Sequence, residues 1–148
     1  MSIGREIVDH IAGTLGLHLD IGSARSVSGG SINTSYCIRD TTGLTYFLKL
    51  NTAASLAMFE AEMEGLRVLR GSNSLKVPRP VACGVADDMT FLMLEWLELS
   101  GHDHGALELL GDGLARLHRV TQERYGWHRD NTIGSTPQPN PASDDWVA

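Results

Sequence analysis

Residues 28–50 constrain the fold of this chain more than any other stretch, because they read as short strands separated by two turns. The first turn is rich in small residues and contains Gly29, Gly30 and Ser31 in a row. Apolar and polar side chains alternate around the turns, which predicts strands. The second turn, at 40–43, ends in glycine and is typical of a hairpin. The stretch therefore predicts antiparallel strands with a glycine turn first and Lys49 inside the third strand.

Lys49 has two interpretations at this stage. A glycine turn can present backbone N–H groups to phosphate oxygens, and a lysine on a following strand can reach the same phosphates. The stretch can equally be an ordinary surface hairpin whose lysine extends its ammonium group into water. A single glycine turn does not distinguish a phosphate site from a plain hairpin.

Glu62 is the second residue that stands out. Residues 55–70 have helical periodicity, and Glu62 follows Phe59 by three positions and precedes Leu66 by four. Neighbours at these spacings share a helix face, so Glu62 lies in the apolar stripe. A carboxylate that faces a core needs a partner. We expect Lys49 to be that partner, with an arginine or a backbone group at the edge of the stripe as the alternative.

The remaining periodicity predicts an α+β fold. A helix is expected at 5–17 and two further strands at 81–85 and 90–94, so the first hundred residues read as helix, three strands, helix and two strands. A helix at 106–120 follows, and one of its faces carries Leu107, Leu110, Leu114 and Leu117. The tail from Trp127 onward shows no clear periodicity, and we expect it to need a partner surface that this chain does not supply.

Composition excludes several classes of protein. The 148 residues suffice for a core, and a formal net charge of −6 disfavours a nucleic-acid partner. No stretch approaches the ~18 apolar residues of a membrane helix, so no membrane contact is expected. The first residues lack a signal-peptide pattern. Cys37 and Cys83 both fall in strand-like runs, and we expect them to be buried thiols of a cytoplasmic protein.

A set of stretches resembles the fructosamine kinase (ketosamine kinase) family, a branch of the aminoglycoside-phosphotransferase-like kinases. In chain order they are SGGSINTSY, YFLKLN, MFEAEMEGLRVL, VPRPVACG, FLMLEWL, GLARLHR and YGWHRDNTIGSTPQPN. The resemblance implies a protein-kinase-like small lobe at 1–95, with an antiparallel five-stranded sheet and one main helix. Residues 96–148 would then be the hinge and the first part of a helical large lobe. The implied activity is ATP-dependent phosphorylation of a sugar hydroxyl on a ketosamine, either a small molecule or a glycated protein amine.

The resemblance also implies roles for single residues. Gly29, Gly30 and Ser31 would lie in the nucleotide loop, Lys49 would hold the nucleotide phosphates, and Glu62 would pair with Lys49.

The stretch from Met93 to Leu97 resembles the hinge between the lobes. There the backbone of Glu95 and Leu97 would bond the adenine ring. The TIGSTPQPN stretch resembles a loop that runs into the larger lobe near the acceptor site.

The catalytic part of the family pattern does not occur in this chain. Family members hold Mg²⁺ and orient the acceptor hydroxyl with an HGD-type loop and a later aspartate, so the resemblance places the metal ligands in a C-terminal half. His128-Arg129-Asp130 spells the catalytic triplet of protein kinases, but that pattern has an asparagine where Ser135 stands. The triplet fits better as part of the YGWHRDNTIG stretch.

Three hypotheses remain. The chain is the N-terminal half of a fructosamine-kinase-like enzyme, incomplete for catalysis by itself. Alternatively, it is a nucleotide-binding module that transfers nothing. In the third hypothesis it is a truncated kinase remnant, which binds nothing or self-associates through the leucine face of the 106–120 helix.

Overall fold

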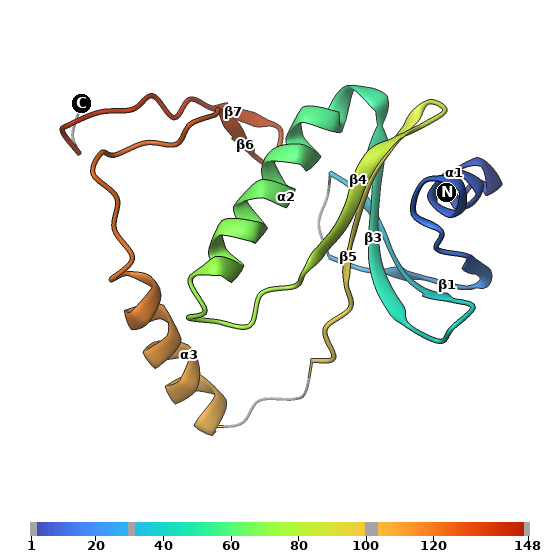
Figure 1. The fold of residues 1–148 in the computed structure, drawn as a ribbon, viewed down its shortest axis with the longest axis horizontal. Coiled ribbons are helices and arrows are strands. Elements are labelled where there is room, and N and C mark those ends of the chain that lie inside the picture. Colours follow the sequence, from blue (N-terminus) through green and yellow to red (C-terminus); the bar gives the residue numbers. More distant parts are fainter. Residues whose placement is uncertain (1–2, 30–31, 100–103, 147–148) are drawn as a thin grey trace.

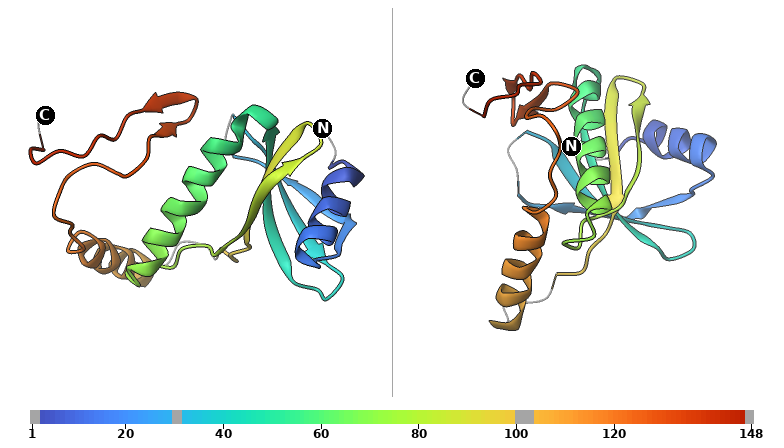
Figure 2. Two further views of the ribbon diagram at one scale, coloured as in Figure 1. Left: turned by 45° about the horizontal axis from the view of Figure 1, so that its top comes forward. Right: turned by 60° about the vertical axis from the view of Figure 1, so that its left-hand side comes forward.

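A computed structural model describes residues 3–29, 32–99 and 104–146 (Figure 1). Its centre is a five-stranded sheet with a helix on each face, as the two further views also show (Figure 2). The elements in chain order are α1 Arg5–Leu15, β1 Leu19–Val27, β2 Thr34–Asp40, β3 Thr45–Thr52, the short 3-10 helix η1 Ala53–Ser55, α2 Leu56–Gly71, β4 Pro80–Ala86, β5 Met89–Glu95, α3 His104–Leu117, β6 Asn131–Ile133 and β7 Thr136–Gln138.

The sheet has the order β1-β2-β3-β5-β4, and all neighbouring strands are antiparallel. The predicted α+β fold with five antiparallel strands is therefore confirmed. β3 is the central strand, where Lys49 lies opposite Ser35 of β2 and Leu92 of β5. Since a central strand is held by ladders on both sides, the backbone at Lys49 is among the most constrained in the sheet.

The period of two along β3 divides the core into two layers. Leu48 and Leu50 are buried on the face that α1 covers, together with Ile11. On the opposite face Phe47 packs against the layer that contains Phe59 of α2. The sequence predicted α2 as the one main helix of the sheet. In the structure α1 covers the second face, because its buried side chains also follow a helical stripe.

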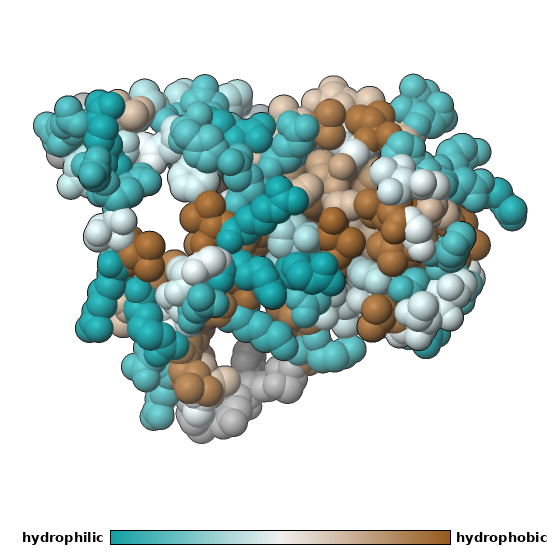
Figure 3. All heavy atoms as spheres, in the orientation of Figure 1, coloured by the Kyte–Doolittle hydropathy of each residue, from teal (hydrophilic) through white to brown (hydrophobic). Residues whose placement is uncertain are grey.

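α3 is joined to the lobe mainly through the loop after α2. Gly113 lies against Leu75 so closely that a Cβ at this position would overlap that side chain. Arg116 donates a hydrogen bond to the carbonyl of Ser74 at 3.1 Å. The predicted leucine face of α3 stays largely exposed, with Leu107 at 63% and Leu110 at 47% of their full accessibility. Figure 3 shows brown, apolar atoms at the surface around α3.

The tail contains a hairpin that the sequence did not predict. β6 and β7 pair in antiparallel fashion, and Gly134 in their turn has a positive φ of 63°. Strands of three residues are too short for an alternating pattern to be visible. The hairpin does not run away from the lobe: β6 lies against α2 (Figure 1). α2 thus supplies a contact surface for this segment, but Ile133 remains 68% exposed, and the expectation that the tail needs a further surface stays a prediction.

Across the part of the chain that the structure describes, no helix has the length and apolar character needed to cross a membrane.

Candidate functional site

The predicted ion pair between Lys49 and Glu62 is present. Lys49 Nζ donates to both carboxylate oxygens of Glu62, at 2.8 Å to Oε1 and 2.6 Å to Oε2. The ammonium group also lies 5.7 Å from the ring centroid of Phe59, within the range of a cation–π contact. The alternation of β3 turns Lys49 toward α2, and the helical stripe of α2 turns Glu62 toward the sheet. The pair therefore follows from the strand period of β3 and the helical period of α2, which turn these two side chains toward each other.

The pair is partly shielded from water. The side chains of Lys49 and Glu62 are 18% and 33% exposed. A lysine has three N–H donors, and Glu62 is the one hydrogen-bond partner of the Lys49 ammonium group among the described residues. A donor on Lys49 is thus free for a ligand, while Glu62 fixes where that donor stands.

The glycine turn lies between β1 and β2. Gly29 has φ 124°, a backbone conformation that side-chain-bearing residues rarely adopt, and a Cβ there would meet nothing within 4 Å. Glycine is therefore required at this position by backbone conformation. The other two predicted loop residues, Gly30 and Ser31, lie outside the described residues.

An apolar hollow opens beside the end of β5. Its walls come from β1, β3, β5 and the segment that follows β5, and its volume is about 410 Å³. Val27, Phe47 and Leu94 contribute apolar side chains, and Trp96 lies with its ring 6.3 Å from that of Phe47. A slot with apolar walls and a stretch of open backbone at its edge suits a flat aromatic group that also needs hydrogen bonds.

The three predicted hinge residues, Met93, Glu95 and Leu97, differ from one another in their position relative to the hollow. Glu95 and Leu97 both line the hollow. The N–H of Glu95 already donates to the carbonyl of Arg79 at 2.8 Å, whereas the N–H of Leu97 has no backbone acceptor among the described residues. Leu97 is therefore the better backbone donor for a ligand.

The structure does not bring the Met93 side chain to the hollow. Met93 is fully buried in the layer that faces α1, opposite Leu48, and its neighbour Leu94 lines the hollow instead. Sequence reasoning missed Leu94 and Phe47 as lining residues. For Phe47 the signal was available, because alternation along β3 puts it on the same face as Lys49. Leu94 lies on β5 and shares this face only through the pairing of β5 with β3.

A second hollow, of about 420 Å³, adjoins the ion pair itself. Lys49 and Glu62 form part of its wall, Asn33 comes from the residue directly before β2, and Asn131 and Thr132 come from β6. The unexpected hairpin of the tail thus contributes polar side chains next to the predicted phosphate-binding lysine.

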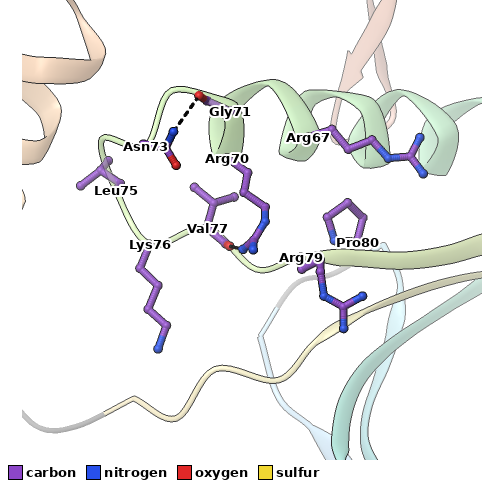
Figure 4. A pocket seen from close by; sticks show the side chains of 9 residues that line it. All are labelled: Arg67, Arg70, Gly71, Asn73, Leu75, Lys76, Val77, Arg79 and Pro80. Carbon is purple, nitrogen blue, oxygen red and sulfur yellow. Dashed lines mark hydrogen bonds between the residues drawn. The ribbon is translucent and has the colours of Figure 1, made fainter.

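A third hollow lies where α2 ends and β4 begins, and it is basic. Arg67, Arg70, Lys76 and Arg79 line it, and Arg70 is bonded to the carbonyl of Val77 at 3.1 Å. Figure 4 shows that the side chains of Arg67 and Lys76 point in different directions. The cations therefore do not converge on one point as they would around a bound anion.

The triplet His128-Arg129-Asp130 contacts α2 and the base of the hairpin. His128 Nε2 lies within hydrogen-bond distance of the Glu64 carboxylate, and Arg129 Nη1 is 3.4 Å from the same group. Asp130 accepts a hydrogen bond from the N–H of Asn140 at 2.8 Å. Each member of the triplet has a structural partner, which agrees with its interpretation as part of a family stretch and not as a catalytic loop.

With this strand order and this lysine–glutamate pair, the first part of the chain is a kinase-like N-terminal lobe. The sequence matches the fructosamine kinase family over residues 4–148. The chain belongs to the fructosamine kinase family, and the predicted resemblance is confirmed.

Individual relatives agree with this assignment. A probable ketoamine kinase of Synechocystis sp. is 43% identical over 142 residues, which cover 95% of this chain and 48% of the relative. The chloroplastic protein-ribulosamine 3-kinase of Oryza sativa subsp. indica is 36% identical over 137 residues, or 90% of this chain and 40% of the relative. A solved structure from Haemophilus somnus, described as a fructosamine-3-kinase, superimposes with a TM-score of 0.84 at 27% identity over 97% of this chain and 48% of that one. This chain thus spans about half the length of the relatives it matches.

Proposed function

We propose that this chain is the nucleotide-binding half of a fructosamine (ketosamine) kinase, with ATP as the phosphate donor. The observation that carries the proposal is the Lys49–Glu62 pair, which lies on the same sheet face as an apolar hollow at the end of β5. Residues 1–95 would form the nucleotide lobe. Residues 96–148 would contain the hinge and the start of the second lobe.

The spacing of the two features fits a nucleotide. Phe47 lines the apolar hollow and Lys49 lines the neighbouring one, and both point to the same face of β3. Two residues along a strand span about 7 Å. A base held between Val27 and Leu94, with a hydrogen bond to the backbone of Leu97, would direct its phosphates toward Lys49. Gly29 would let the turn between β1 and β2 approach these phosphates closely.

Transfer of the phosphate requires groups beyond this half. Mg²⁺ neutralises the charge on the transferred phosphate when it is bound, and a carboxylate orients the acceptor hydroxyl. The chain has no HGD-type loop to supply them. We therefore propose that the metal ligands and the acceptor site come from the part of the family fold that this chain does not span. The acceptor would be a ketosamine, on a small molecule or on a protein amine.

A second function follows from the same observation. A chain with a complete lysine–glutamate pair and hinge but without the transfer groups can act as a nucleotide-binding module. The two functions differ in whether phosphate is transferred from ATP. A nucleotide-binding module leaves ATP intact even when a ketosamine and a C-terminal half of the family fold are both present.

The test is isothermal titration of the purified chain with ATP and Mg²⁺. We expect binding by the natural chain and a loss of at least about tenfold in affinity for Lys49→Ala. Lys76→Ala is the matched control, since Lys76 lies in the basic hollow away from the pair, and it should bind as the natural chain does. No binding by the natural chain, or equal binding by Lys49→Ala, would contradict the proposed site. Phosphorylation of a ketosamine by this chain alone would contradict its catalytic incompleteness.

A further inference from the structure

The tail of the chain is bound to the outer side of α2. Arg129 approaches three groups on that helix: its Nη1 is 3.4 Å from Glu64 Oε2, and its Nη2 is 3.7 Å from Glu60 Oε2 and 3.4 Å from the carbonyl oxygen of Ala57. His128 contacts Glu64 as well. One arginine thus contacts two successive turns of the helix, through the carboxylates at i and i+4.

The charges on this side of α2 are balanced by the tail. Burial alone would raise the pKa of the Glu64 carboxyl, but hydrogen bonds from His128 and Arg129 lower it below its usual value. Glu64 therefore carries its negative charge at neutral pH. Arg67, on the next turn, is the other cation of α2 on this side, and it lines the same surface hollow as Glu60, Glu64 and Arg129.

The tail and the sheet hold α2 from opposite sides. A helix turns by about 100° per residue, so Glu62 points roughly away from both Glu60 and Glu64. Glu62 is bonded to Lys49 on the sheet side, and the other two carboxylates meet Arg129 on the outer side. The rotation of α2 about its axis is thus restrained at two opposite faces.

The hairpin extends this contact to the glycine turn. A Cβ at Gly134 would lie 3.0 Å from Cδ1 of Ile32, so the tip of the hairpin lies directly on the residue that follows the turn. At its base, Asn140 donates from its backbone to Asp130 and from its side chain to Asn131 at 3.1 Å. The hairpin therefore contacts both α2 and Ile32, the residue that follows the glycine turn.

We propose that residues 127–140 form a clamp on α2 and that Arg129 is its positioning residue. The clamp holds the helix in the rotation that keeps Glu62 on Lys49, so the pair is assembled before any ligand arrives. Arg129 touches neither the predicted nucleotide hollow nor Lys49, and it acts through α2. The consequence for nucleotide affinity rests on the proposed function, whereas the restraint on α2 does not.

The first experiment measures hydrogen exchange of the α2 amides in the free chain. Arg129→Ala should raise exchange across α2 by about fivefold, the size expected from losing a small network of charged contacts. Arg129→Lys should restore part of the protection. Arg124→Ala is the matched control, because Arg124 lies in the same tail but pairs with Asp144 and not with α2. Unchanged α2 exchange in Arg129→Ala would overturn the clamp, whether or not the chain binds ATP.

The second experiment separates positioning from general stability. Arg129→Ala should weaken ATP binding by about fivefold in the natural chain, and should have no further effect in a Glu62→Gln background, where the pair is already broken. Equal losses in both backgrounds would show that Arg129 supports the fold only, and would overturn its positioning role. If Arg129→Ala does not fold, Glu64→Gln removes one of its carboxylate partners without changing the shape of α2 and takes its place in both experiments. Absence of ATP binding in the natural chain would count against the proposed function, and the exchange data would still decide the clamp.

Discussion

The Lys49–Glu62 pair should be measurable as a coupling energy in the stability of the free chain. The perturbation is a double-mutant cycle with Lys49→Met, Glu62→Gln and the two together. Methionine keeps most of the length of the lysine stem, and glutamine keeps the shape of the glutamate. The cycle therefore removes charge with little change in packing.

The exposure of the pair sets the expected magnitude. Ion pairs at the surface contribute about 0–1 kcal/mol, and breaking a fully buried pair costs about 3–5 kcal/mol. With Lys49 18% and Glu62 33% exposed, this pair lies between those limits. Each single change should cost about 1–2 kcal/mol, because the remaining partner keeps a half-shielded charge. The double mutant should lose about 1 kcal/mol less than the sum of the two single losses.

Urea unfolding followed by circular dichroism is a suitable assay, with midpoints compared at equal slopes. The exposed pair of Arg124 and Asp144, whose side chains are 55% and 84% exposed, is the internal control and should show a coupling of at most about 0.5 kcal/mol. If the losses from Lys49→Met and Glu62→Gln simply add in the double mutant, the pair is not an energetic unit in solution and the reasoning fails.

Three further outcomes are expected. Val27→Trp should fill part of the apolar hollow and weaken ATP binding by about tenfold in titration calorimetry, with the melting temperature nearly unchanged; full affinity would contradict a base-binding role for the hollow. Asp40→Asn should lower the melting temperature by about 3 °C at neutral pH, since the Asp40 carboxylate accepts hydrogen bonds from Thr42 and from the Tyr46 hydroxyl. Burial alone would raise the pKa of Asp40, but these hydrogen bonds lower it below the usual aspartate value. The contribution of the Asp40 carboxylate to the stability of the fold is therefore fully present above the usual pKa of an aspartate, and it is lost as the pH falls through the lowered pKa. The difference in melting temperature between the natural chain and Asp40→Asn should therefore disappear in acid. A difference that stays constant with pH would contradict a stabilising role for the ionised Asp40 carboxylate. We expect the natural chain to self-associate through the exposed face of α3, which sedimentation velocity would show as a concentration-dependent profile. Leu110→Glu should reduce this association without loss of stability, and an unchanged sedimentation profile would remove α3 as the contact surface.

Much of the fold could be predicted because its elements are long and periodic. The strands of the main sheet are seven to nine residues long, and β3 alternates between buried and half-buried positions over most of its length. α2 runs for 16 residues and turns Phe59 into the core. The hairpin β6–β7 could not be predicted in the same way, because its strands have three residues each and their positions depend on contacts with α2. Local sequence carries little information about such short segments.

In the candidate site, too, some features follow from local periodicity and others only from tertiary contacts. The sequence itself determined which face of its own element Lys49 and Glu62 each occupy. A strand period of two and a helix period of 3.6 assign a residue to one face, whatever the rest of the chain does. Only the tertiary structure decided that Leu94 and not Met93 reaches the hollow, and that Arg129, far along the chain, contacts Glu60 and Glu64. Periodicity gives the direction of a side chain within its own element. Which distant segment fills the space that it faces depends on how the elements pack and on charges that meet only after folding.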